Sequence, residues 1–189
     1  MIKNIIAAVR TDEDFEAVLS SDLEKIFMLD SNILTVEFII KKAHEAGKKV
    51  FIHIDFAEGI GKDKYGLMFL KQCGVDGIIS TRTNIIKLAK EVGLYSVQRF
   101  FIVDSHSVKT TVESAKVSKA DMIEVMPCTG TKVTARLKQI LDMPIIAGGL
   151  VESYDDIDAA LENGAEFVST SDKAFWEISK GDNKYGSDK

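Results

Sequence analysis

The chain has 189 residues, 46% of them hydrophobic and 28% charged, which is the composition of an ordinary globular domain with one sizeable core. Its formal net charge of −5 excludes a generally basic protein that coats nucleic acid, although one local basic face is compatible with it. The two cysteines lie far apart and no apolar run reaches the roughly 18 residues of a membrane span, so neither a disulfide framework, a zinc site nor a membrane partner is indicated.

Eight short runs rich in Ile, Val and Phe recur along the chain at nearly even spacing. Each is short enough for a strand and apolar on both faces, which is typical of parallel strands that are covered on both sides. The first run reads as a strand and not as a signal peptide, because no small-residue cleavage site follows it. In chain order the predicted strands are Ile5–Val9, Ile26–Leu29, Val50–Ile54, Gly77–Ile79, Ser96–Val103, Met122–Val125, Ile145–Ala147 and Phe167–Val168.

Segments with apolar residues at helical spacing separate these runs. The seven clearest are Phe15–Leu19, Val36–Ala43, Tyr65–Phe69, Ile85–Ala89, Val108–Ala115, Val133–Ile140 and Ile157–Leu161. A short segment at Ala174–Ile178 is a candidate eighth helix. Glycines that favour left-handed caps are expected just after four helices, at Gly47, Gly74, Gly93 and Gly164. Side chains suited to N-caps precede four helices, at Thr11, Thr83, Ser105 and Ser153.

Eight strand–helix units without a break in composition predict a compact, single-domain (β/α)8 barrel of the TIM type. The alternative is an open, doubly wound sheet. The length lies just under the usual lower end for a barrel, about 200 residues, so the helices must be short or one unit irregular. We expect the domain to span residues 1–180 and the polar segment 181–189 to form a disordered tail.

Residues at the strand ends are the candidates for ligand binding, because barrels of this kind bind ligands there. Gly148 and Gly149 follow the seventh predicted strand, and glycine lets backbone amides approach an anion without a Cβ in the way. Thr170 and Ser171 follow the eighth strand and precede a short predicted helix, Asp172–Trp176, whose N-terminus would offer free N–H groups. We predict a phosphate site at these four residues. The alternative without a ligand is a tight turn at the glycines beside an ordinary helix cap.

The other strand ends combine cations, carboxylates and a histidine that could hold the hydroxyls of a small polyol phosphate. They are Arg10, Asp30, His53, Asp55, Thr81, Arg82 and Glu124. The competing interpretation is a solvated strand end with ordinary ion pairs. We expect His53 and Asp55 to face the same side because they are two residues apart in a strand. No metal site is predicted, since the other two histidines fall on helix or loop positions away from His53.

The same residues would also suit a proton-abstracting enzyme, with Glu124 as the base and His53 or Arg82 as the electrophile. No lysine stands at a predicted strand end, which disfavours an aldolase of the Schiff-base type. Basic residues gather around the second helix (Lys41, Lys42, Lys48 and Lys49) and along the sixth (Lys132, Arg136 and Lys138). Each cluster alone is more typical of a solvated helix face than of an RNA site.

Several strings of residues occur in a fixed order from about Ile5 to Trp176. They include Ala8–Arg10, Leu29–Asp30, His53–Asp55 with Glu58–Gly59, Asp76–Arg82, Gln98–Phe101, Ile123–Pro127, Ile145–Leu150, Thr170–Lys173 and Phe175–Trp176. Together they resemble the glycerol-3-phosphate-responsive antiterminators, which regulate bacterial glycerol-uptake operons. The loop Pro127–Gly130 departs from this pattern, because Cys and Thr stand where Gly-rich sequence is expected after the proline.

The resemblance implies a cytoplasmic TIM-barrel regulator that has no cofactor, senses glycerol 3-phosphate and binds leader mRNA to prevent premature termination of transcription. If so, Lys132, Arg136 and Lys138 are the candidate RNA contacts, and a homo-oligomer is an open alternative to a monomer. The alternative function is an isomerase, epimerase or lyase that acts on a phosphorylated triose or sugar at the same site. A non-catalytic, partner-binding barrel is a third interpretation, since the fold hosts many functions.

Overall fold

Eight parallel strands close into a barrel in the computed structural model, which describes residues 4–176. Going round the barrel, the order is β1, β10, β9, β8, β7, β6, β4 and β2, and each strand pairs in parallel with both neighbours. The strands are β1 (Ile5–Val9), β2 (Lys25–Met28), β4 (Lys49–His53), β6 (Gly77–Ser80), β7 (Tyr95–Phe101), β8 (Met122–Met126), β9 (Ile145–Gly148) and β10 (Phe167–Thr170). The predicted barrel is confirmed, and the open sheet is excluded.

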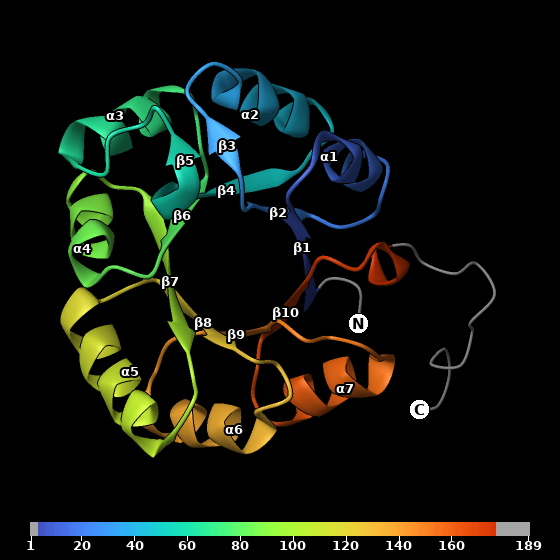
Figure 1. The fold of residues 1–189 in the computed structure, drawn as a ribbon, viewed down its shortest axis with the longest axis vertical. Helices are drawn as coiled ribbons and strands as arrows, with labels where there is room; N and C mark the ends of the chain where they lie inside the picture. Colours follow the sequence, from blue (N-terminus) through green and yellow to red (C-terminus); the bar gives the residue numbers. More distant parts are fainter. Residues whose placement is uncertain (1–3, 177–189) are drawn as a thin grey trace.

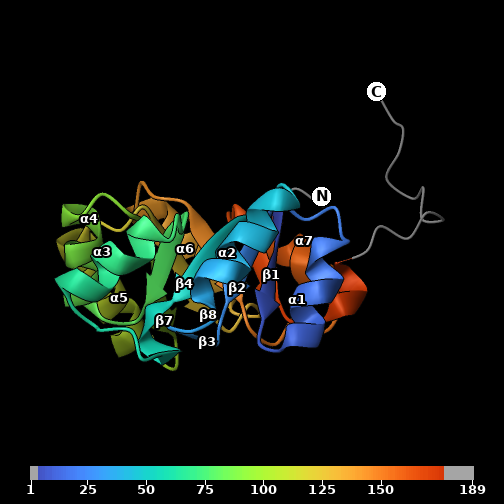
Figure 2. The same ribbon diagram turned by 90° about the horizontal axis from the view of Figure 1, so that it is seen from above.

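Seven α-helices surround the barrel within the described residues, one after each of the first seven barrel strands (Figure 1). They are α1 (Asp12–Leu19), α2 (Val36–Glu45), α3 (Lys64–Gln72), α4 (Thr83–Glu91), α5 (Ser105–Ser118), α6 (Thr131–Ile140) and α7 (Tyr154–Glu162). Seen from the side in Figure 2, the helices run beside the strands. Except for the 14-residue α5, each has ten residues or fewer, which is how a full barrel fits into so short a chain.

The eighth unit ends differently from the prediction. In place of a helix at Ala174–Ile178, a three-residue 3-10 turn spans Lys173–Phe175, and Ile178 lies outside the described residues, as does the predicted tail at 181–189. The indole Nε1 of the buried Trp176 donates to the Thr170 carbonyl at 3.0 Å, and the ring packs in the apolar cluster between the strands and the helices, where a helix was expected.

Helix boundaries follow the predicted caps in part. Gly47, Gly74, Gly93 and Gly164 all have positive φ, and Thr11 and Ser153 are N-caps that accept hydrogen bonds from the first turn. Two expected caps are wrong by one residue. Asp104, and not Ser105, caps α5 through its carboxylate, and the hydroxyl of Thr83 instead accepts a hydrogen bond from Gln98 at 3.0 Å.

An irregular segment follows β4 that the sequence does not signal. The strand ends at His53, Ile54–Phe56 forms a 3-10 turn, and β5 (Ala57–Glu58) pairs with β3 (Ser31–Asn32) in a two-stranded sheet outside the barrel. The predicted strand residue Ile54 is therefore in the turn. The strand-parity reason for placing His53 and Asp55 on one side is wrong, because Asp55 is not in a strand.

Inward-facing side chains fill the barrel in layers. The apolar layers are made by residues such as Ile6, Phe27, Phe51, Val97 and Ile146, which form one buried cluster inside the sheet. Near the carboxyl ends of the strands the inward positions become polar, with buried His53, Arg99, Glu124 and Ser169. The barrel thus has an apolar interior beneath a polar upper layer, and the candidate site lies over that layer.

Candidate ligand site at the mouth of the barrel

A cavity of about 370 Å³ opens at the carboxyl ends of the strands. Two arginines border it, Arg10 from the end of β1 and Arg99 from β7. Its remaining wall comes from the loop after β9, the end of β10 and apolar side chains of β1, β2 and β8: Ala8, Leu29, Met126, Gly149, Leu150, Val151, Ser169, Thr170, Ser171 and Asp172. The cavity therefore combines two cations with two strand–loop junctions.

A buried ion pair supports the floor of this cavity. Glu124 and Arg99 lie opposite each other on β8 and β7, and the Arg99 Nε donates to Glu124 Oε2 at 2.5 Å. Ser169 donates to the other carboxylate oxygen, Oε1, also at 2.5 Å. Glu124 is 0% exposed and Arg99 5%. Since both carboxylate oxygens already accept hydrogen bonds from the protein, the pair is a fixed element that orients the Arg99 guanidinium.

Two polar groups of this layer have no hydrogen-bond partner among the described residues. One is the Nη2 of Arg99, and the other is the imidazole of His53, both of whose nitrogens are buried and unpaired. Buried polar atoms are normally hydrogen-bonded, because leaving one unpaired costs about 1–3 kcal/mol. Arg99 lines the cavity and is a candidate for contacting a ligand, whereas His53 is buried below it and is not among the lining residues.

His53 is held in its neutral form. Burial lowers the pKa of the imidazole from 6.5 to about 4, and the positive charge of Arg99 adds to the effect. The ring also packs against Phe56, with 4.7 Å between the ring centroids. At neutral pH His53 therefore offers one N–H donor and one nitrogen acceptor.

This imidazole should make stability depend on pH in a defined direction. Between pH 6.5 and 4 the unfolded chain binds a proton at His53 that the folded chain does not, so the free energy of unfolding falls as the pH is lowered through this range. Between pH 7 and pH 5 wild type should lose about 2 kcal/mol more than His53→Gln, which cannot titrate there. Urea unfolding of both proteins at the two pH values checks this; equal losses would contradict it.

The residues predicted to bind phosphate lie at the cavity with one exception. Gly149, Thr170 and Ser171 line it, whereas Gly148 is the last residue of β9 and does not. A Cβ on Gly148 would collide with Ser169 Oγ and lie 2.8 Å from Glu124 Oε1. Gly148 thus provides the room in which the Glu124–Ser169 hydrogen bond forms.

The expected helix N-terminus after β10 is not available in the form we predicted. The turn at Lys173–Phe175 is too short for a helix dipole, and the Asp172 carboxylate accepts from the Ala174 N–H at 2.9 Å. The backbone N–H groups of Gly149, Leu150 and Ser171 make no hydrogen bond within the described part of the chain, and all three residues line the cavity. Gly149 adopts φ +73° and Leu150 φ +55°, so this loop is held in a conformation that L-residues rarely take.

The remaining predicted site residues form two separate groups. Asp55 accepts hydrogen bonds from the Ser80 hydroxyl, from the N–H and hydroxyl of Thr81 and from Arg82, at 2.8–3.0 Å. Burial alone would raise the pKa of Asp55, but these bonds outweigh it and hold the pKa below its ordinary value. Asp55, Thr81 and Arg82 therefore clamp the turn after β4 to the end of β6 and do not line the cavity.

The Oδ2 of Asp30 lies 3.9 Å from the Nη1 of Arg10 in an exposed ion pair. Both residues border a second hollow of about 260 Å³ beside the first. Arg10 is thus shared by the two hollows, and Asp30 belongs only to the outer one. Within the described residues no three His, Cys, Asp or Glu side chains gather as a metal site would require.

The predicted RNA contacts Lys132, Arg136 and Lys138 are all exposed on α6. The lysine cluster around α2 is divided. Lys48 is buried and donates to the Ser21 carbonyl, and Lys42 pairs with Glu16. Of the two clusters, only the one on α6 is wholly free of such contacts among the residues that the structure describes.

Arg99 is the site residue that our sequence analysis missed. It appeared only within a string that carried the family resemblance, because its apolar neighbours mark the segment as a strand and say nothing of a ligand. The signal that could have found it is parity: Arg99 lies two residues from Val97 and Phe101, so it shares the inward face of β7. A cation at that position is buried and needs a carboxylate partner.

Known proteins of similar sequence add to this geometry. The family model described as the glycerol-3-phosphate responsive antiterminator matches residues 5–176. This chain belongs to that family. A crystal structure of a glycerol uptake operon antiterminator regulatory protein from Listeria monocytogenes is 34% identical, with a TM-score of 0.88 over 93% of this chain and 96% of that one.

Two further proteins are similar to this antiterminator-family protein over most of its length. An antiterminator-related protein from Thermotoga maritima is 32% identical and superposes with a TM-score of 0.83, covering 94% of this chain and all of its own. The uncharacterized protein YgcP of Escherichia coli is 35% identical over 177 residues, 93% of each chain.

Within the described part of the chain, no helix is long and apolar enough to cross a membrane.

Proposed function

We propose that this antiterminator-family protein binds glycerol 3-phosphate at the mouth of its barrel and, in that state, binds the leader mRNA of glycerol-utilisation genes to prevent premature termination. The observation that carries the ligand assignment is the pairing, in one cavity, of two arginines with three backbone N–H groups that are unengaged within the described residues. On this proposal the protein acts in the cytoplasm, where the leader transcript is made.

The cavity suits a ligand with one dianionic end and one polar, uncharged end. The N–H groups of Gly149, Leu150 and Ser171 and the guanidinium of Arg10 are the donors for the phosphate, because charge-assisted bonds to an anion are about twice as strong as neutral ones. The Nη2 of Arg99, which has no partner among the described residues, is then the donor for a glycerol hydroxyl, whereas His53 does not line the cavity. Glu124 holds Arg99 in place and does not itself bind the ligand.

The same arrangement favours binding over turnover. Glu124, the base in the enzyme hypothesis, has both oxygens engaged in short hydrogen bonds, and Arg82, a candidate electrophile, is bound to Asp55 away from the cavity. No lysine is among the described residues that line the cavity. The alternative function is an isomerase, epimerase or lyase that acts on a phosphorylated triose or sugar. A turnover assay must exclude it.

Retention of the leader transcript should depend on the small ligand. We expect saturating glycerol 3-phosphate to tighten binding of the RNA about 5- to 150-fold, the usual range for coupling between two sites, and the RNA to tighten binding of glycerol 3-phosphate by the same factor. Filter binding with and without the ligand, and calorimetry with and without the RNA, measure the two factors. Glycerol is the matched control, because it lacks the phosphate and should leave RNA retention unchanged.

Equal RNA affinity with and without glycerol 3-phosphate would overturn the regulator. Conversion of glycerol 3-phosphate, of a phosphorylated triose or of a phosphorylated sugar, followed by phosphorus NMR in the same samples, would favour the enzyme.

A further inference from the structure

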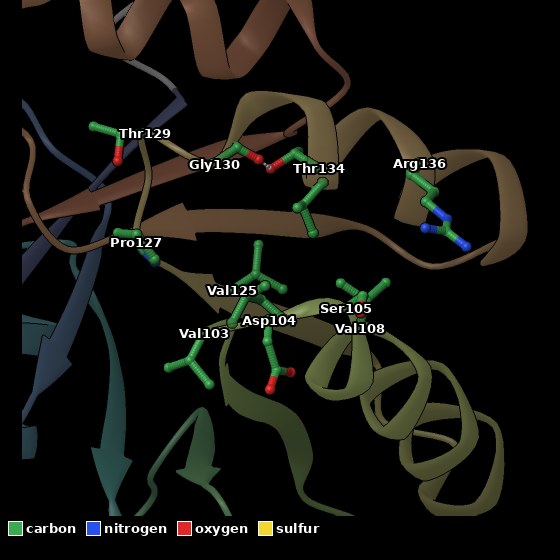
Figure 3. A pocket seen from close by; sticks show the side chains of 12 residues that line it. Val103, Asp104, Ser105, Val108, Val125, Pro127, Thr129, Gly130, Thr134 and Arg136 are labelled. Atoms are coloured by element: carbon green, nitrogen blue, oxygen red, sulfur yellow. Dashed lines mark hydrogen bonds between the residues drawn. The ribbon is translucent and has the colours of Figure 1, made fainter.

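Another hollow lies outside the barrel, between α5 and α6. It measures about 430 Å³ and is separate from the ligand cavity. Figure 3 shows α5 and α6 on opposite sides of it, with Val103 and Val125 between them. Its walls are mainly aliphatic, and its rim carries hydroxyls, a carboxylate and a guanidinium from Ser105, Thr129, Thr134, Asp104 and Arg136.

The charge of the outer helices is distributed unevenly around the barrel. α6 carries three cationic side chains and no carboxylate, and α5 carries two lysines and one glutamate. In contrast, α1 and α7 each carry four carboxylates and no cation. In Figure 1 α1 and α7 lie on the right, flanking β1 and β10, and α5 and α6 lie together at the lower left. Among these four helices a polyanion is therefore attracted most to α6 and repelled most by its neighbour α7, since three carboxylates of α1 are paired with Lys42 and Lys173.

One loop borders both the ligand cavity and this hollow. Met126, at the end of β8, lines the cavity, and the next residues Pro127, Thr129 and Gly130 line the hollow. Within the same loop the Cys128 N–H donates to the carbonyl of Gly149 at 2.9 Å. The segment proposed to bind phosphate is thus hydrogen-bonded to the loop that opens onto α6.

We propose that the α5–α6 face is the RNA-binding surface, with one unpaired base in the hollow and RNA phosphates on Lys132 and Arg136. This inference rests on the proposed function. An RNA occupant is favoured because the hollow combines aliphatic walls with the guanidinium of Arg136, and single-stranded bases are bound by stacking on arginine planes and by hydrogen bonds to their edges. Val103, 84% exposed at the edge of the hollow, presents apolar surface to such a base. Ser105 and Thr129 add hydroxyls to the lining at two separate places, where either could bond a polar edge of the base.

Charge reversal and pocket filling test the two parts of this proposal separately. We expect Lys132→Glu/Arg136→Glu to weaken binding of the leader transcript at least tenfold in saturating glycerol 3-phosphate, and to lower the slope of log affinity against log salt by about two. Ser105→Trp, at an exposed position, should fill the hollow and weaken binding with the salt slope unchanged. Lys41→Glu on α2 is the matched control, because Lys41 is exposed and makes no ion pair among the described residues.

Each variant is first shown by calorimetry to bind glycerol 3-phosphate as wild type does. If wild type itself fails to retain the RNA, the proposed function fails. If wild type retains it and the α6 double variant binds equally well, or if Lys41→Glu alone loses binding, the α5–α6 surface is wrong. If Ser105→Trp binds the RNA with wild-type affinity and the double variant does not bind it, the hollow does not hold a base, but the α5–α6 face is still the RNA-binding surface.

Discussion

Replacing Glu124 with alanine should lower the free energy of unfolding by about 3–5 kcal/mol, the usual cost of removing one partner of a buried ion pair. The guanidinium of Arg99, 5% exposed, would keep its charge with no carboxylate beside it, and the Ser169 hydroxyl would lose its acceptor. Urea unfolding monitored by circular dichroism measures the loss.

Two further variants distinguish the effect of losing the charge from the effect of losing side-chain volume. Glu124→Gln retains the shape and one acceptor, so it should cost less than alanine. Arg99→Met/Glu124→Leu removes both charges and should recover most of the stability, since apolar pairs of similar volume often replace buried ion pairs without loss. The double variant should nevertheless fail to bind glycerol 3-phosphate, because Arg99 is a proposed ligand contact. A double variant less stable than Glu124→Ala would contradict this account of the pair.

Replacing Gly149 with valine should weaken binding of glycerol 3-phosphate at least 100-fold while the barrel stays folded. The φ of +73° at Gly149 is unfavourable for a β-branched residue, so the loop must change its path and carry its N–H groups away from the phosphate. Loss of two charge-assisted bonds, each about 1.5–3 kcal/mol, corresponds to a factor of this size or larger.

Gly47 provides a matched control for the Gly149 experiment. It has the same φ of +73°, lies at the end of α2, and has no atom within 4 Å of the place that a Cβ would occupy. Gly47→Val should therefore cost similar stability and leave the ligand affinity unchanged. Calorimetry measures the affinity of each variant for glycerol 3-phosphate, with Gly47→Val reporting backbone strain away from the cavity and Gly149→Val reporting strain at the cavity. Wild-type affinity in a folded Gly149→Val protein would place the phosphate elsewhere.

The periodic parts of this fold could be read from the sequence because each depends on local chemistry. Apolar runs became strands, helical spacing became helices, and the four capping glycines adopted positive φ. Errors arose where two neighbouring residues compete for one role. The Asp104 carboxylate displaced Ser105 as the cap of α5, and Thr83 used its hydroxyl for Gln98 on a different element.

The candidate site could be predicted only in outline, because its decisive contacts depend on register between strands. That Glu124 faces Arg99 follows from pairing of β7 with β8, which a single sequence does not encode in any local pattern. The clamp of Asp55 onto Thr81 and Arg82 likewise depends on a turn that interrupts β4. Strand-end residues therefore marked the right end of the barrel but could not be sorted into those that line the cavity and those that support it.

The uneven charge around the barrel gives the molecule an electric dipole. Its positive end lies at α5 and α6, and its negative end lies on the side of α7 and α1, which carry four carboxylates each. The field of a polyanion turns such a dipole so that the positive end leads. Encounters with any polyanion should therefore begin from a restricted range of orientations, and this advantage should shrink as added salt screens the charges.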